Sequence, residues 1–477
     1  MKLKYLFLSF VLIAFTGCDA DLDSMEGMPV FLDIDSGDAD FERFVAVGAS
    51  VTAGYTDNAL FQAGQMNSYP NIMASVMAHA DGGVFTQPYT NDNVGGLLLF
   101  GNQIAGPRLF FNGAGPAPVS GSPTTEVSDV MSGPFSNLAV PGARAIHFLA
   151  PGYGSMAGLM VGQANPYYVR MASSDGASVI GDALAQAPTF VSLFSGGNDA
   201  LGFATSGGTS TLTAPGDFDF ALGTTMAMLA SSGADGIIVN IPDVTSLAFL
   251  NTVPYNSIPL DDGTAQMLNG GFAAYNGGLQ VFAMMGMISA AEAAARTIVF
   301  AAGQNAVTIE DSDLTDLSLF GVPSYRMATA DDKVVLTAMT FLGTTVGGNP
   351  TLINGVSVPL ADNWVLTASE VAEAQAAISS FNGTIQGLAS QYGWAHWDAH
   401  AVLNQVVTQG YPMDGFVMTA DFVMGGLFSL DGVHPTARGA ALIAKLMLAE
   451  IDAHYGSNLS DVHLDIGDYP TNYPDGL

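Results

Sequence analysis

A serine that ends an apolar run is the first side chain of this sequence suited to catalysis. Residues 44–50 read FVAVGAS, so Ser50 stands where a buried strand should end and a turn of small residues begins. A serine there can act as a nucleophile, as part of a phosphate-binding loop, or as a helix cap. A phosphate loop needs a lysine after its second glycine, but Tyr55 follows Gly54. The dinucleotide pattern G-x-G-x-x-G is absent, and Thr52 stands where the G-x-S-x-G nucleophile elbow has its second glycine. From this segment alone, Ser50 can be either a helix cap or a nucleophile.

A nucleophilic serine needs a base and a carboxylate that orients the base, and the C-terminal part of the chain offers both. In the segment LDGVHPTARG, Asp431 and His434 are three residues apart, just before a predicted helix. A turn at Asp431-Gly432 would let the carboxylate bond one imidazole nitrogen and leave the other free to take a proton from serine. The alternative for this pair is a surface histidine near a helix cap.

Two further segments offer hydrogen-bond donors for an oxyanion. SNLAVPGARA, residues 136–145, places Gly142 after a short apolar run and a proline. FSGGNDAL, residues 194–201, places Asn198 directly after a predicted buried strand. A backbone N–H and a side-chain amide are the donors that an oxyanion hole uses, although an Asn at a strand end also fits a plain turn.

The four segments together resemble blocks I, II, III and V of the SGNH hydrolases, also called GDSL esterases and lipases. GASVTAGY resembles block I, NLAVPGA block II, GGND block III and DGVHP block V. The resemblance implies a nucleophile at Ser50, its partners at Asp431 and His434, and oxyanion donors at Ser50, Gly142 and Asn198. It also implies a three-layer α/β/α sandwich with a mostly parallel, flavodoxin-like sheet, and a carboxylic-ester hydrolase that works through an acyl-enzyme without metal or cofactor.

Block I departs from the family pattern, because Ala49 stands where the family has an aspartate. That acid is not a triad member in the family, so we expect this protein to be active. The sequence does not indicate which residues hold the turn at Ser50 in place of the aspartate. Two other functions remain as alternatives: a carbohydrate O-acetyl esterase, and a surface-binding lipoprotein on an inactive hydrolase scaffold. An inactive scaffold is disfavoured because the five candidate site residues are all present: Ser50, Gly142, Asn198, Asp431 and His434. Apolar insertions, and three tryptophans confined to one late stretch, favour small or lipid esters over sugar acetates.

Apolar runs that alternate with helical patterns position these segments. Strands are predicted at 44–47, 187–197, 236–244 and 394–399, and helices at 68–80, 271–295, 367–393 and 436–454. Ser68 is the expected cap of the first helix, and Thr367 with Glu370 suggests a capping box. This order predicts a mostly parallel sheet between helices. We expect one domain at 43–456, with insertions at about 81–135 and 300–365 and a tail at 457–477.

The N-terminus predicts export and a lipid anchor. Residues 1–17 have a positive start and an apolar stretch that is too short to span a bilayer, as in a signal peptide. The ending FTGC resembles the lipobox of bacterial lipoproteins, with Phe15 in place of the usual Leu, and Cys18 is the only cysteine. Residues 18–42 are interpreted as an acidic tether with a lipidated Cys18, and the chain as anchored in the cell envelope, at the outer membrane or cell surface. An ordinary signal peptide with an incidental cysteine is the alternative.

The charge of the chain limits its partners. Lys and Arg number 11 against 43 Asp and Glu, giving a net charge of −32. Nucleic-acid binding needs clustered cations, so we expect no nucleic-acid partner. The acidity is spread along the chain, which favours a solubility adaptation over an acidic recognition surface. The expected partners are an ester substrate, small or lipid, and the membrane reached through Cys18.

Three remaining patterns suggest weaker possibilities. His396 and His400 are four apart but straddle a predicted strand end without a third ligand, so no metal site is predicted. DIDSGDADFE faintly resembles a calcium loop, but Gly37 occupies a ligand position. The apolar runs at 97–101 and 108–111 would fill a small core or, alternatively, line an acyl pocket or form a lid.

Overall fold

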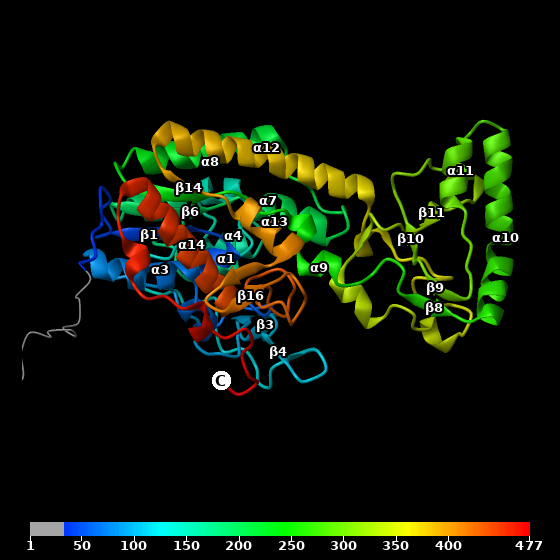
Figure 1. Cartoon of the computed structure of the whole chain (residues 1–477), viewed down its shortest axis with the longest axis horizontal. Coiled ribbons are helices and arrows are strands. Elements are labelled where there is room, and N and C mark those ends of the chain that lie inside the picture. The colour runs from blue at the N-terminus through cyan, green and yellow to red at the C-terminus, as the bar shows by residue number, and fades with distance from the viewer. Residues whose placement is uncertain (1–32) are drawn as a thin grey trace, which may run out of the picture. The chain divides into compact units, whose positions relative to one another are not determined.

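In the computed structural model, which describes residues 33–477, four parallel strands form the central sheet (Figure 1). They are β1 (Phe44–Gly48), β6 (Phe190–Phe194), β7 (Asp235–Val239) and β14 (Ala395–Trp397), in the spatial order β1-β6-β7-β14. Most of their residues are buried, as expected for a parallel sheet covered by helices on both faces. The prediction of an α/β fold with a mostly parallel sheet is confirmed.

A fifth segment, residues 136–140, continues the sheet beyond β1. Ala46 donates its N–H to Ser136 O at 2.9 Å, and Leu138 and Val140 donate to Ala46 O and Gly48 O, each at 2.9 Å. The segment runs parallel to β1. Numbered along the chain, the five segments lie in the spatial order 2-1-3-4-5, which is the flavodoxin-like order. The order reverses between β1 and β6, and ligands of such sheets bind outside the carboxyl ends of the strands at this point.

Helices cover both faces of the sheet and complete three layers. Figure 1 shows α8 (Pro215–Ala230) and α12 (Ala368–Tyr392) on one face, and α3 (Tyr69–Met77) and α14 (Ala437–Tyr455) on the other. Helix α14 buries Ala440, Met447 and Ile451 on the side that packs against α3 and β14, as its apolar spacing predicts.

Side-chain caps fix the start of two of these helices. The capping box at α12 is present: Thr367 Oγ1 accepts from Glu370 N, and Glu370 Oε2 accepts from Thr367 N at 2.7 Å. Thr436 caps α14 by accepting from Gly439 N at 3.0 Å. Ser68 is the N-cap residue of α3 as expected, but its hydroxyl bonds Gln87 Oε1 rather than an N–H of the first turn.

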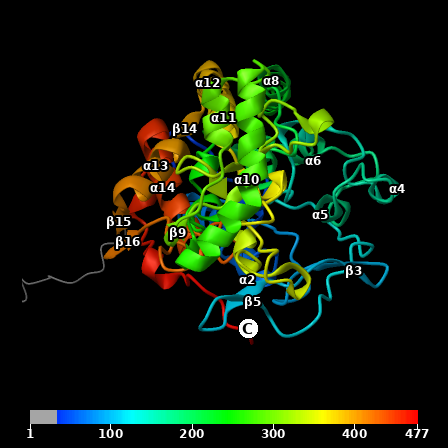
Figure 2. The same cartoon turned by 90° about the vertical axis from the view of Figure 1, so that its right-hand side faces the viewer.

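A separate group of elements lies to one side of the sheet (Figures 1 and 2). It comprises β8 (Ile258–Leu260), α10 (Asp262–Met284), α11 (Ala290–Arg296), β9 (Gly303–Asn305), β10 (Thr308–Glu310) and β11 (Tyr325–Met327). The single helix expected at 271–295 is therefore two helices. Ser289 separates them, since its Oγ accepts from Glu292 N at 3.0 Å and starts α11. The insertion expected at about 300–365 overlaps this group, which begins earlier in the chain.

The segment expected as an insertion at about 81–135 contains two hairpins. They pair β2 (Leu97–Leu99) with β3 (Asn102–Ala105) and β4 (Leu109–Phe111) with β5 (Pro116–Pro118). The buried Arg108 ties this segment to the C-terminal tail, because its guanidinium donates to Pro474 O at 2.6 Å. Further regular elements are α2 (Gln62–Met66), α4 (Met156–Leu159), α5 (Pro166–Val169), α6 (Val179–Leu184), α9 (Ala248–Asn251), β12 (Lys333–Val334), β13 (Val365–Leu366), β15 (Tyr411–Met413) and β16 (Phe416–Met418).

The predicted signal peptide, Cys18 and the first part of the tether lie outside the described residues and stay predictions. Residues Ile34–Leu477 form one compact unit. Within residues 33–477 there is no helix with the length and apolar character needed to cross a bilayer.

Candidate active site

The nucleophile candidate begins a short helix directly after the first strand. Helix α1 (Ser50–Ala53) starts at Ser50, two residues after the end of β1, and Ser50 is 8% exposed. Gly48 makes this sharp turn possible, because a Cβ there would lie 2.0 Å from Thr52 Oγ1 and 2.9 Å from Phe194 O. The close approach of the backbone thus requires glycine before the serine.

Buried polar contacts support this turn where Ala49 offers no side-chain oxygen. Asn137 Nδ2 donates to Thr52 O at 3.0 Å. The hydroxyls of Thr52, Tyr69 and Ser192 form a chain with two distances of 3.1 Å, which links α1 to α3 and β6. Burial raises the pKa of Tyr69 to about 12, so this link stays neutral over the physiological range. These contacts hold the turn at Ser50, although residue 49 has no side-chain oxygen to do so.

The structure brings Ser50, His434 and Asp431 together, although Ser50 and His434 are 384 positions apart. His434 Nε2 lies 2.8 Å from Ser50 Oγ, and His434 Nδ1 lies 2.8 Å from Asp431 Oδ2. Because a carboxylate only accepts hydrogen bonds, Nδ1 carries the proton and Nε2 is left to accept from the serine hydroxyl. This is the arrangement of a Ser-His-Asp triad.

Four N–H groups bind the carboxylate of Asp431. Its Oδ2 accepts from His434 Nδ1 and from Asn58 N at 2.9 Å, and its Oδ1 accepts from the backbone N–H groups of Val433 and His434 at 2.8 Å. Burial alone would raise the pKa of Asp431, but the charge of His434 and the hydrogen bonds from His434 and Val433 lower it to about 2. The carboxylate of Asp431 is therefore ionised at neutral pH.

Of the three expected oxyanion donors, Gly142 and Asn198 lie in the same cleft as Ser50 and His434. Gly142 has φ +82°, a left-handed conformation that favours glycine. Asn198 is the second residue of α7 (Gly197–Thr205), and its Nδ2 donates to Ala143 O at 2.9 Å. A side-chain amide has two donor hydrogens, so the other hydrogen of Asn198 is available to a ligand. The cleft has a volume of about 460 Å³.

The turn after α1, residues 56–58, clamps the loop that carries Asp431 and His434. Asp57 N donates to Ser429 Oγ at 3.0 Å, and Asp57 Oδ1 accepts from Leu430 N at 3.0 Å. Thr56 Oγ1 donates to Pro435 O at 2.9 Å. This clamp was not predicted from the sequence. Its only signal is the pair Asp57-Asn58, two residue types that tolerate the left-handed φ of +50° and +64° found there.

Asp57 is also a second buried carboxyl beside the triad. It is 1% exposed, and burial raises its pKa to about 7 despite the hydrogen bond from Leu430. The nearby charge of Asp431 raises this pKa further, and the charges of Arg108 and His434 lower it. Asp57 therefore exchanges its proton near neutral pH, next to the loop that holds His434.

An Asp57→Asn variant should gain stability relative to the wild type as the pH rises. The folded-state pKa of about 7 lies above the ordinary 3.8, so the carboxyl's stabilising contribution is complete below about pH 4 and is lost as the pH rises through about 7. That difference corresponds to at most about 4 kcal/mol, and a neutral amide removes it while still offering an oxygen to Leu430 N. Urea unfolding of both proteins between about pH 5 and pH 8 measures the effect. A difference in unfolding free energy that stays constant with pH would contradict it.

The other residues considered from sequence lie elsewhere. His396 is on β14 and His400 on α13 (Ala399–Gln409), where His400 Nδ1 lies 3.2 Å from Ile241 O. Among the described residues, no group of three or more His, Cys, Asp or Glu side chains is placed to hold a metal ion. Leu97 packs with Val127 and Val169 in a small apolar cluster, and the lining of the cleft includes no residue of 97–101 or 108–111.

Comparisons with known proteins add little to this geometry. No protein-family model and no curated protein matches the chain. Among solved structures, an α/β hydrolase enzyme from the metagenome of Lake Arreo, Spain, is similar at 9% identity and a TM-score of 0.33, covering 87% of this chain and 96% of its own. Phospholipase A1 from Streptomyces albidoflavus NA297 is similar at 13% identity and a TM-score of 0.27, covering 86% and 98%. Values this low establish no family, so the chemistry rests on the site itself.

Proposed function

We propose that the protein is a serine carboxylic-ester hydrolase of the SGNH type, acting through an acyl-enzyme on Ser50. The observation that carries the proposal is the hydrogen-bonded line from Ser50 Oγ through His434 to Asp431, with 2.8 Å at each step. Gly142 and Asn198 in the same cleft support it, because they supply the donors that an oxyanion needs. The four sequence blocks and the strand order 2-1-3-4-5 support the SGNH assignment over an α/β-hydrolase elbow.

The first half of the reaction transfers the acyl group to the enzyme. Ser50 Oγ attacks the ester carbonyl carbon while His434 Nε2 takes the hydroxyl proton. The carbonyl oxygen becomes an oxyanion, which the N–H groups of Ser50 and Gly142 and the amide of Asn198 stabilise. Each such donor contributes about 3 kcal/mol in the transition state. The bond from carbon to the alcohol oxygen then breaks, and His434 gives its proton to the leaving alcohol.

The second half returns the enzyme to its starting state. Water attacks the acyl carbon and gives a proton to His434 Nε2, and the same donors hold the new oxyanion. The bond between the carbon and Ser50 Oγ breaks, the proton returns to Oγ, and the carboxylic acid leaves. Asp431 stays ionised throughout and holds the imidazole in the required tautomer.

A fluorophosphonate probe tests the proposal directly, because it reacts with serines that a neighbouring base activates. We expect one stoichiometric adduct, located at Ser50 by peptide mass spectrometry and absent after heat denaturation. A protein that stays unlabelled under conditions where a known serine hydrolase reacts would refute an active site at Ser50.

An Asn198→Ala variant should lower kcat by about 10²-fold with little change in KM, because the amide acts on charge that develops only in the transition state. The measurement is steady-state hydrolysis of p-nitrophenyl acetate. If kcat were unchanged, or if only KM rose, Asn198 would not belong to the oxyanion hole.

A further inference from the structure

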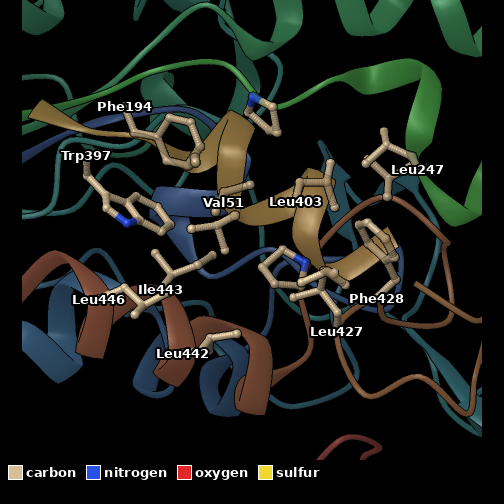
Figure 3. A pocket seen from close by; sticks show the side chains of 16 residues that line it. Val51, Phe194, Leu247, Trp397, Leu403, Leu427, Phe428, Leu442, Ile443 and Leu446 are labelled. Carbon is tan, nitrogen blue, oxygen red and sulfur yellow. The ribbon is translucent and has the colours of Figure 1, made fainter. Parts of the chain in front are cut away.

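A second hollow, here called the flank cavity, shares the wall residue Val433 with the proposed catalytic cleft. Figure 3 shows the side chains that line it. All 16 residues that line it are apolar or aromatic, and it has a volume of about 100 Å³. Val51, Phe194, Trp397, Leu403, Ile443 and Leu446 form much of its wall, with Leu403 on α13 and Ile443 and Leu446 on α14. A hollow of this composition accepts hydrocarbon.

The flank cavity adjoins the catalytic residues at two points. Val433, which is partly exposed, lines both the flank cavity and the cleft around Ser50. Pro435 lines the flank cavity as well, so both chain neighbours of His434 belong to its wall. Val51, the residue after Ser50, is a third wall residue. The flank cavity therefore lies on the His434 side of the proposed reacting centre, with Val433 common to both hollows.

We propose that the flank cavity binds the alkyl chain of the alcohol part of the ester, so that the preferred substrates are esters of short, unbranched aliphatic alcohols. This inference rests on the proposed function. His434 Nε2 must give its proton to the alcohol oxygen, so the alcohol lies on the His434 side of Ser50. The acyl oxygen is held by Gly142 and Asn198 instead, and the acyl chain has the rest of the cleft, with Tyr167 and Leu201 in its lining.

The size of the flank cavity sets the chain length. An apolar cavity of about 150 Å³ binds benzene, which has six carbons, so a hollow of about 100 Å³ holds about four carbons. The wall offers no charged or amide side chain, so a sugar hydroxyl would lose hydrogen bonds to water there. A butyl group fits this hollow, whereas a polyol does not.

Binding of the alkyl chain should appear in kcat/KM, which reports the step that expels the alcohol. Each methylene moved out of water contributes about a 4-fold gain. For acetate esters of the wild type we expect kcat/KM to rise about 16-fold from ethyl to butyl and to level off between butyl and octyl, once the flank cavity is full.

Two matched variants on α13 test the site. Val402 lines the flank cavity, whereas Val407 on the same helix is 44% exposed and does not line it. Val402→Phe should abolish the roughly 16-fold preference for butyl over ethyl acetate, and Val407→Phe should keep it. Each preference is a ratio within one variant, so differences in the amount of folded enzyme cancel. Ile443→Ala, which enlarges the hollow, should move the plateau to longer alcohols by one or two carbons.

A second series, ethyl esters from acetate to octanoate, separates the two ends of the substrate. We expect Val402→Phe to leave the dependence on acyl length unchanged. If the variant altered the acyl series and spared the alcohol series, the flank cavity would hold the acyl chain and the assignment would be overturned. If it altered neither, the flank cavity would not be a substrate site. Fluorophosphonate labelling of Ser50 with an unchanged alcohol preference refutes the flank cavity alone, whereas loss of both labelling and ester turnover refutes the proposed function as well.

Discussion

A Ser50→Ala variant should hydrolyse p-nitrophenyl acetate with a kcat about 10⁶-fold below that of the wild type. The substitution removes the only atom that can form the acyl-enzyme, and His434 Nε2 is then left without its 2.8 Å partner. Oxyanion donors and substrate binding persist, so the residual rate should still exceed that of water by about 10³-fold. The melting temperature should change little, because Ser50 loses a single hydroxyl at the edge of the cleft.

Ser195→Ala is a matched control for this experiment. Ser195 follows β6 at the same end of the sheet and is 2% exposed, and its Oγ has no hydrogen-bond partner among the described residues. Removing it takes away a buried hydroxyl of the same kind without touching the cleft, so kcat should stay within about 3-fold of the wild type. Turnover of the Ser50→Ala variant within 10-fold of the wild type would show that Ser50 is not the nucleophile.

The five candidate site residues could be picked out from the sequence because each lies in a short segment with a recognisable local pattern. Ser50 and Asn198 each follow an apolar strand, and the carboxyl ends of parallel strands meet at one edge of a sheet. Gly142 has the same relation to residues 136–140, which were not predicted as part of the sheet. That segment makes an irregular ladder with β1, and its proline and glycine hide the strand pattern.

The clamp formed by residues 56–58 could not be predicted from the sequence. Asp57 and Asn58 look like ordinary turn residues, and their importance comes from Leu430 and Asp431, which lie more than 370 positions away. Nothing local indicates such a contact. The side-chain environment of Asp57 decides its pKa, and that environment exists only after the chain has folded. The same holds for the flank cavity, whose wall combines residues from both ends of the chain.

An Asp431→Asn variant should lower kcat by about 10⁴-fold while the protein stays folded. Each carboxylate oxygen of Asp431 accepts two hydrogen bonds. An amide has only one oxygen that accepts, so asparagine cannot satisfy all four donors. If the amide oxygen keeps the N–H groups of Val433 and His434, its NH₂ group faces His434 Nδ1. The imidazole must then carry its proton on Nε2, where it cannot accept the proton of Ser50.

Measurements of unfolding free energy and of the fluorophosphonate labelling rate distinguish this tautomer effect from a general loss of folded structure. The pKa of about 2 lies below the ordinary 3.8, so the carboxylate stabilises the fold by about 2 kcal/mol above pH 4, and this contribution is lost as the pH falls towards 2. The variant should therefore unfold at lower urea concentration at neutral pH and match the wild type more closely near pH 3. Labelling of Ser50 should slow by a factor similar to the loss in kcat, since both need the base. A variant that loses stability but keeps its labelling rate would show that Asp431 only holds the loop in place, and the triad would reduce to Ser50 and His434.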